Sequence, residues 1–179
     1  MSHVVTIHGS PQAGSRSAAV ANHLAELVHA AGFETAAITV RDLPAAELVA
    51  GRGDSGLLAA AVERVTRARA LIVATPVYKA SFTGLLKLFL DALAPDALAG
   101  KIILPLATGA SLAHFLSIDY AMRPVLAALG AEHVLRGVYL VDAQIIKDAG
   151  GRFSFADDAA AELRRAAEAV VASLKESRT

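Results

Sequence analysis

Short apolar runs alternate along the chain with longer stretches of helical periodicity, and this alternation restricts the fold more than any other feature of the sequence. The strand-like runs are Val4–Ile7, Glu34–Val40, Ala70–Ala74, Ile102–Ala107 and Val134–Val141. The helix-like stretches are Ser17–Ala31, Ser55–Arg67, Phe82–Ala92, Leu112–Leu129 and Ala156–Lys175. Apolar strands separated by helices are typical of a parallel sheet that is buried on both faces. We therefore expect an α/β protein built in three layers.

The order of these elements also predicts a strand order. Right-handed crossover connections place helices on both faces of a parallel sheet. Five strands with one candidate phosphate loop after the first predict the flavodoxin-like order 2-1-3-4-5, in which ligands bind above the carboxyl ends of the strands. The loops after the first, third and fourth strands should then converge. A chain that is 55% hydrophobic and 19% charged agrees with a buried sheet, and we expect residues 1–179 to form one domain.

The first loop, His8–Ser17, has the composition of a phosphate-binding loop. It stands between a strand and a helix, so the free N–H groups at the start of that helix face whatever lies above the loop. Gly9 and Gly14 permit a tight backbone, three serines supply hydroxyl groups, and Arg16 adds a cation. The loop predicts a phosphate site, although the same residues also suit an ordinary capped helix.

Two well-known nucleotide-binding patterns do not fit this loop. The dinucleotide pattern G-x-G-x-x-G is absent, because no glycine stands two residues after Gly9. The triphosphate pattern G-x-x-x-x-G-K-[ST] nearly occurs from Gly9 to Gly14, but Ser15-Arg16 replaces the lysine step. Since that lysine contacts the β- and γ-phosphates, its absence argues against ATP and GTP. The predicted ligand group is a single terminal phosphate monoester.

Two further loops should lie at the same edge of the sheet. After the third strand, Pro76 stiffens the chain while Tyr78 and Phe82 bring aromatic side chains. Such a loop can hold a flat heterocycle, or its tyrosine can simply pack over the end of the sheet. After the fourth strand, the small residues of Thr108–Ser111 either let a ring approach closely or cap a helix.

Three segments together resemble the NADPH-dependent FMN reductases, and in particular the alkanesulfonate-utilisation type: GSPQAGSRS, LIVATPVYKASFTGLLK and KIILPLATGASLAHFLSIDYAMRPVL. The resemblance covers the chain from about Val4 to about Val141, and the combination of PVYK with IDYAMRPVL is its most specific part. By position, the residues that would hold the FMN phosphate are Ser10, Gln12, Ser15, Arg16 and Ser17. The residues that would border the isoalloxazine ring are Pro76, Val77, Tyr78, Lys79, Thr108, Gly109 and Ser111.

The resemblance implies hydride transfer from NADPH, or from NADH, to FMN. Reduced FMN would then pass to a flavin-dependent monooxygenase in sulfonate-sulfur assimilation. Because the cofactors carry the covalent steps, neither a catalytic side chain nor a metal is required. Arg16 and Lys79 are the best candidates to meet the phosphates of the nicotinamide dinucleotide. Gln12 stands where the family often has arginine, so we expect the hold on phosphate or the nicotinamide preference to differ.

Pro124 lies inside an otherwise helical stretch and cannot donate a hydrogen bond to the carbonyl group of Tyr120. This loss predicts a kink or a one-residue π-bulge near Tyr120. The resembling reductases are similar in having an inserted tyrosine and a π-helix here, at a subunit interface near the flavin. That tyrosine is linked to the release of FMN as a product. We expect the same role for Tyr120, with a core tyrosine beside a proline kink as the alternative.

Composition argues against several other functions. Lysine plus arginine and aspartate plus glutamate number 17 each, so we expect neither a nucleic-acid partner nor a membrane partner. The chain has no cysteine, and its six histidines show no ligand spacing, so we expect no metal site. The amino terminus lacks the features of a signal peptide, and we expect a cytoplasmic protein. Arg52–Asp54 matches an adhesion tripeptide, but helix capping by Asp54 or Ser55 is the better interpretation.

The resemblance also implies a homo-oligomer, either a dimer or a tetramer. Two helix-borne apolar stripes are candidates for its interface, although such stripes more often belong to the core: Leu85, Leu86 and Phe89, and Leu112, Phe115 and Leu116. Three alternatives to a flavin-releasing reductase stay open. They are a quinone, azo-dye or metal-ion reductase that keeps FMN, an electron carrier, and a phosphate-binding module without a redox role. Electron carriers of this architecture usually have an acidic surface, which a neutral chain does not provide.

Overall fold

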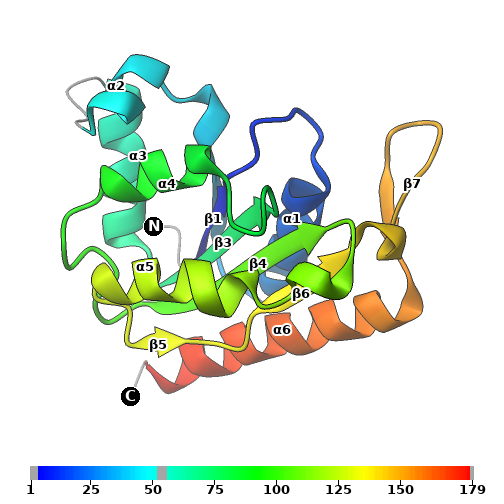
Figure 1. Ribbon diagram of the computed structural model, residues 1–179. Helices are drawn as coiled ribbons and strands as arrows, with labels where there is room; N and C mark the ends of the chain where they lie inside the picture. Colours follow the sequence, from blue (N-terminus) through cyan, green and yellow to red (C-terminus); the bar gives the residue numbers. More distant parts are fainter. Residues whose placement is uncertain (1–3, 52–55, 178–179) are drawn as a thin grey trace.

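A computed structural model describes residues 4–51 and 56–177 of the protein (Figure 1). The main sheet has the strand order β2-β1-β3-β4-β5, and β6 also pairs with β4. All pairings in this sheet are parallel. The strands are β1 (Val4–His8), β2 (Thr35–Thr39), β3 (Ala70–Pro76), β4 (Ile102–Gly109), β5 (His133–Val134) and β6 (Val138–Val141). The order confirms the predicted flavodoxin-like fold.

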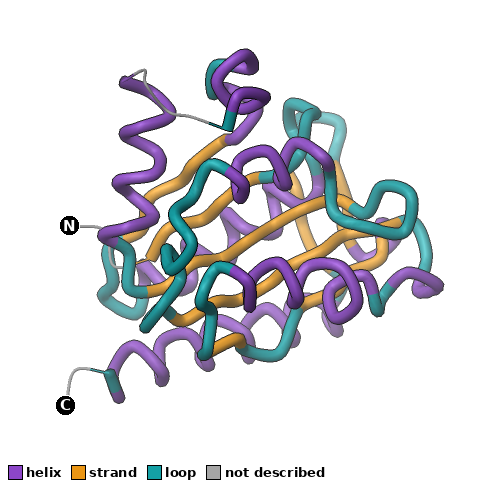
Figure 2. The backbone as a smooth tube through the Cα atoms, turned by 60° about the vertical axis from the view of Figure 1, so that its left-hand side comes forward, coloured by secondary structure: helices purple, strands orange, loops and turns teal. Residues whose placement is uncertain are grey.

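Helices cover both faces of the sheet (Figure 2). One face packs against α1 and α6, and the other packs against α3, α4 and α5. Their bounds are α1 (Arg16–Ala30), α3 (Gly56–Arg67), α4 (Gly84–Asp91), α5 (Arg123–Ala128) and α6 (Asp157–Glu176). Because side chains alternate along a strand, Val4 of β1 enters the first core and Val5 enters the second. This double burial explains why the strands are apolar throughout.

Two expected elements are interrupted in the structure. The run Val134–Val141, predicted as one strand, forms β5 and β6 with a break between them. Gly137 lies in this break, and a Cβ atom there would come within 2.9 Å of Ile118. The guanidinium of Arg123 donates to the carbonyl oxygen of Leu135 at 2.9 Å. The prediction of one continuous strand was therefore wrong, because this part of the backbone bonds to a side chain and packs against the segment before α5.

The stretch Leu112–Leu129, predicted as one helix, consists of three pieces. A 3₁₀ turn at Leu112–His114 is followed by a π-helix at Ile118–Met122 and then by α5. In the π-helix, the N–H of Arg123 donates to the carbonyl oxygen of Ile118, five residues earlier. Pro124 falls in the first turn of α5, where a missing N–H costs little. The predicted π-bulge near Tyr120 is confirmed, whereas the continuous helix is not.

Two regions have more structure than the sequence indicated. The expected surface excursion from Asp42 to Ser55 contains the short helix α2 (Ala45–Ala50), and Asp54 and Ser55 lie outside the described residues. After β6, the strands β7 (Ile145–Lys147) and β8 (Phe153–Phe155) form an antiparallel hairpin. This hairpin projects from the main body of the molecule (Figure 1). Within the described part of the chain, no helix combines the length and apolar character needed to cross a bilayer.

Candidate active site

Close packing holds the loop after β1 against the sheet. The N–H of Gly9 donates to the carbonyl oxygen of Ala74 at 2.8 Å, and the Thr83 hydroxyl donates to the carbonyl oxygen of Gly9. A Cβ atom at Gly9 would lie 2.7 Å from the Cβ of Leu86 in α4. A side chain at position 9 would therefore collide with α4, so glycine is required for this approach of loop and helix.

Hydroxyl groups organise the rest of this loop. Ser15 caps α1, with its Oγ accepting the N–H of Ala18 at 3.2 Å. The Oγ of Ser10 accepts the N–H of Gln12 at 3.2 Å. Gly14 has a φ of 59°, in the left-handed region that favours glycine, and it turns the chain into the helix. The loop thus presents hydroxyl and backbone donors at the positive end of α1, which suits a phosphate.

The loops after β3 and β4 are joined to each other. The N–H of Val77 donates to the carbonyl oxygen of Thr108 at 2.7 Å. Tyr78 and Ser81 exchange backbone hydrogen bonds across a tight turn, whose two central residues, Lys79 and Ala80, both have positive φ. Thr83 then caps α4 by accepting the N–H of Leu86 at 3.1 Å. The loops after β3 and β4 are therefore hydrogen-bonded to each other where they leave the sheet.

All three loops converge on a cavity of about 490 Å³ at the carboxyl end of the sheet. Nine of the twelve residues predicted to bind FMN line it: Ser10, Gln12, Ser15, Arg16, Pro76, Val77, Tyr78, Thr108 and Gly109. The predicted convergence is confirmed as a matter of geometry. The individual binding roles stay predictions.

Three of the predicted residues lie outside the lining of this cavity. Ser17 is buried in the first turn of α1, with its Oγ 3.3 Å from that of Ser15. Lys79 is exposed in the turn after Tyr78. The Oγ of Ser111 accepts the N–H of Ala113 in the 3₁₀ turn at 3.1 Å. A role for these three would have to be indirect or would require movement of the chain.

The β7–β8 hairpin contributes residues that sequence reasoning missed. Lys147 and Phe153 both line the cavity. The Nζ of Lys147 lies 3.9 Å from the position that a Cβ of Gly14 would occupy, so this ammonium group stands over the phosphate loop. It also lies 5.3 Å from the centroid of the Phe153 ring, within cation–π range. The antiparallel pairing places a cation here that follows the loop by about 130 residues in the sequence.

Asp142 is the acidic residue among the described side chains that line this cavity. Its carboxylate lies 3.8 Å from the guanidinium of Arg16, and both side chains are partly exposed. A phosphate bound at this loop would therefore compete with Asp142 for Arg16. The carboxylate acts on Tyr139 as well, because burial first and Asp142 second raise the pKa of that phenol.

Tyr139 of β6 packs behind the loop after β4, next to Gly109, and does not itself line the cavity. Its hydroxyl donates to the carbonyl oxygen of Ser111 at 2.7 Å. A Cβ atom at Gly109 would overlap this same hydroxyl, so a larger residue at position 109 would displace Tyr139. With its pKa raised, the phenol stays protonated at neutral pH and keeps this hydrogen bond. The small residues noticed in the sequence thus make room for a tyrosine of β6.

Comparison with known proteins relates this architecture to a family. Residues 2–145 match the family described as NADPH-dependent FMN reductase. The chain belongs to this family. The match ends at Ile145, the first residue of β7, so Lys147 and Phe153 lie beyond the matched part of this FMN reductase.

Individual relatives agree with this assignment. The chain is 46% identical over 142 residues to FMN reductase (NADPH) of Pseudomonas putida, in an alignment that covers 79% of this chain and 72% of the relative. It is 43% identical over 143 residues to FMN reductase (NADPH) of Escherichia coli K12, covering 80% and 75%. Among solved structures, the apo form of the NADH:FMN oxidoreductase EMOB superposes with a TM-score of 0.86 at 41% identity, covering 95% of this chain and 88% of that one.

Proposed function

We propose that this protein reduces FMN with NADPH or NADH in the cavity formed by the three loops. The observation that carries the proposal is that the serine-rich loop after β1 and the loops after β3 and β4 converge on one cavity of about 490 Å³. Membership of the FMN reductase family supports it. When bound, the flavin ring accepts the hydride from the nicotinamide, and the protein supplies position and electrostatics.

The lining of the cavity fits FMN from end to end. At one end, the phosphate loop and the start of α1 suit a dianionic phosphate, with Arg16 and Lys147 as neighbouring cations. At the other end, Pro76–Tyr78 and Thr108–Ala110 border a narrow space between two joined loops, which suits a flat ring. Tyr78 is 42% exposed and therefore has a free face at the mouth of the cavity. The residues of this chain thus bind the phosphate and orient the ring.

We propose further that reduced FMN leaves the enzyme and serves a flavin-dependent monooxygenase, in the manner of sulfonate-sulfur assimilation. Two features support weak retention of the flavin. Asp142 draws Arg16 away from the phosphate, at 3.8 Å. Tyr120 is 79% exposed on the π-helix, where it is free to enter a subunit interface rather than to pack in the core.

An assembly through the π-helix segment forms part of this proposal. Of the two apolar stripes considered, the one on α4 belongs largely to the core, since Leu86 and Phe89 are fully buried. In the other, Leu112 is 67% exposed and Phe115 is 52% exposed. We expect a dimer or tetramer that buries these side chains together with Tyr120. Light scattering on the eluted protein measures the mass, and a monomer at micromolar concentration would contradict the assembly.

The decisive experiment follows oxidation of NADPH and NADH by the purified protein with FMN, FAD or riboflavin as acceptor. We expect consumption of NADPH or NADH well above the flavin-free blank. FMN should be preferred to riboflavin, because riboflavin lacks the phosphate. Consumption at the blank rate with every flavin would rule out a reductase. A protein that is purified with FMN bound would instead indicate a reductase that retains its cofactor.

Tyr120→Ala tests release. We expect this variant to retain yellow flavin through purification, at about tenfold tighter affinity, while Phe115→Ala on the same surface serves as the control for general disturbance of the interface. The measurement is the flavin absorbance per protein after gel filtration. A colourless Tyr120→Ala protein with unchanged turnover would remove the proposed role of this tyrosine.

A further inference from the structure

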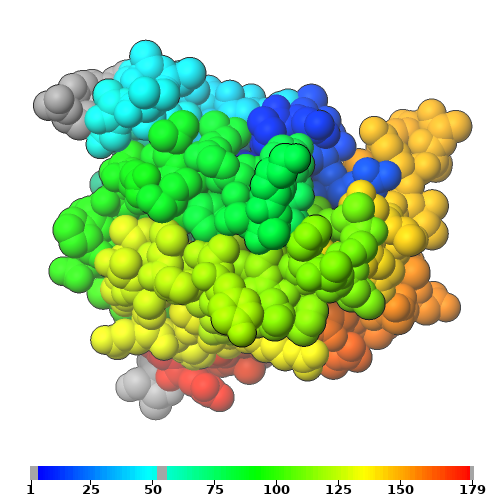
Figure 3. All heavy atoms as spheres, in the orientation of Figure 1, coloured from blue at the N-terminus to red at the C-terminus, as the bar shows by residue number. Residues whose placement is uncertain are grey.

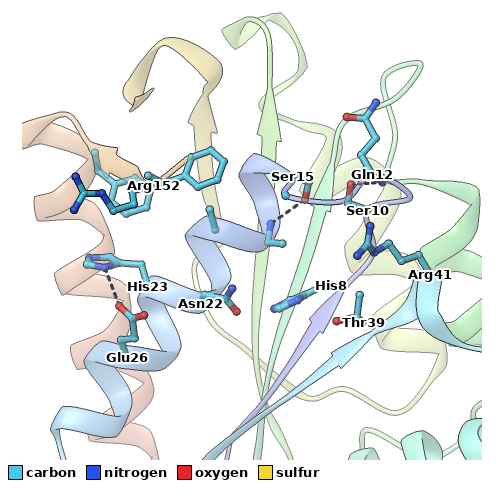
Figure 4. A pocket seen from close by; sticks show the side chains of 15 residues that line it. His8, Ser10, Gln12, Ser15, Asn22, His23, Glu26, Thr39, Arg41 and Arg152 are labelled. Atoms are coloured by element: carbon cyan, nitrogen blue, oxygen red, sulfur yellow. Dashed lines mark hydrogen bonds and ion pairs between the residues drawn. The ribbon is translucent and has the colours of Figure 1, made fainter. Parts of the chain in front are cut away.

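A second cavity, of about 450 Å³, extends from the phosphate loop toward α1, the end of β2 and the hairpin (Figure 4). Its volume is in the range of about 300–1,000 Å³ that is usual for small-molecule sites. Five residues line both cavities: Ser10, Gln12, Gly14, Ser15 and Phe153. The two cavities therefore meet at the phosphate loop.

Cations and aromatic rings define the outer part of this second cavity. Arg41 comes from the turn directly after β2, and Arg152 comes from the hairpin. Glu26 is the acidic side chain among the described lining residues, and its carboxylate lies 3.8 Å from Nδ1 of His23. Phe155 of β8 lies beside the His23 ring, with the ring centroids 4.8 Å apart. Rings of this kind stack on bases, and guanidinium groups bind phosphates.

Polar groups line the base of the cavity, and one of them lacks a hydrogen bond to the described residues. His8 ends β1 with only 6% of its surface exposed, and its Nε2 has no hydrogen-bond partner among the described residues. Burial lowers the pKa of His8, so the ring is neutral at pH 7 and keeps one donor and one acceptor nitrogen. Figure 4 shows His8, Asn22 and Thr39 gathered below the phosphate loop, each from a different element. Buried polar groups are normally paired, so an unpaired one beside a cavity indicates a missing partner.

We infer that the second cavity binds the adenosine-phosphate half of a dinucleotide. The inference rests on the proposed function, in which the phosphate loop holds the phosphate of the flavin. A dinucleotide carries two adjacent phosphates, so a molecule held at this loop extends its second phosphate and its adenosine into the adjoining cavity. The adenine then meets the rings of Phe153 and Phe155, and its edge meets the amide of Asn22.

FAD combines this half with the flavin mononucleotide, so FAD is the ligand that would place its flavin in the first cavity and its adenosine in the second. Arg41 and Arg152 line the second cavity and are the cations available to the second phosphate.

The test compares wild-type protein with two variants. Arg41→Ala removes a cation from the lining, and Asn22→Trp fills the cavity with a large side chain. Arg67→Ala is the matched control: Arg67 pairs with Glu63 on the surface, as Arg41 pairs with Asp42, but Arg67 lines neither cavity. Calorimetry measures the Kd of FMN and of FAD. FMN lacks an adenosine, so its Kd should change less than twofold in both variants.

If FAD uses the cavity, both variants weaken FAD binding about tenfold. This result supports the inference. Unchanged FAD binding in both variants, or a wild-type protein that binds FMN but not FAD, would overturn it and leave the proposed function standing. A wild-type protein that binds no flavin would overturn the proposed function itself.

Discussion

The phosphate loop and the β7–β8 hairpin face the same cavity, yet they are attached to the molecule in opposite ways. The loop is bonded to β3 and packed against α4 through Gly9. The hairpin forms a separate two-stranded sheet, and its tip protrudes beyond the body (orange, upper right of Figure 3). Changes in the loop should therefore reduce stability and binding together, whereas changes in the hairpin should reduce binding alone.

The largest effect is expected from Gly9→Val. Its side chain would overlap Leu86 and the carbonyl oxygen of Ala74, and forced overpacking costs about 2–3 kcal/mol of the free energy of unfolding. Urea denaturation measures this loss. Gly84→Ala is the matched control, because a Cβ there meets nothing within 4 Å at the start of α4, and its stability should be equal or slightly higher. A Gly9→Val protein as stable as wild type would show that the loop is not locked to α4.

Lys147→Ala tests whether a change in the hairpin weakens binding without loss of stability. Loss of an ammonium group over the phosphate loop should weaken FMN binding about tenfold, while the free energy of unfolding changes by less than about 0.5 kcal/mol. Riboflavin binding should not change, because riboflavin has no phosphate. Lys175→Ala, on the last turn of α6, is the control for loss of one positive charge. Equal weakening of FMN and riboflavin would place Lys147 away from the phosphate.

A smaller effect of the opposite sign is expected from Asp142→Asn. Without its carboxylate, Arg16 is available to the phosphate, so FMN should bind about two- to threefold more tightly at low salt. The gain should shrink as the salt concentration rises, because the pair is partly exposed. Calorimetric titrations at two salt concentrations measure it. Weaker FMN binding in this variant would mean that Asp142 positions Arg16 rather than competing for it.

The smallest effect concerns pH. Burial holds the pKa of His8, at the base of the loop, below its ordinary value of 6.5. The unfolded chain therefore takes up a proton before the folded one does, and stability falls as the pH drops below about 6.5. His8→Gln should lose less stability than wild type between pH 7.5 and pH 5.5, measured by urea denaturation. The exposed His29, changed to glutamine, should follow the wild-type curve; a His8→Gln curve that does the same would refute the assignment.

Local patterns in the sequence determined much of this protein. Alternating apolar runs predicted the strand order, because only buried parallel strands need such residues on both faces. Pro124 predicted the π-helix, because the loss of one N–H acts within a single turn. The convergence of the three loops followed from the strand order, since all three leave the same edge of the sheet.

The tertiary structure alone decided the remaining parts of the site. Nothing local distinguishes Lys147 from any other surface lysine, and its place over Gly14 depends on where β6 ends and how the hairpin pairs. His8 was one histidine among six until the neighbouring elements enclosed it, with no partner for its Nε2 in the described part of the chain. The physical reason is the range of the interactions: capping, periodicity and proline effects act within a few residues, whereas burial, charge pairing and cavity shape are set by segments that meet only in the folded chain.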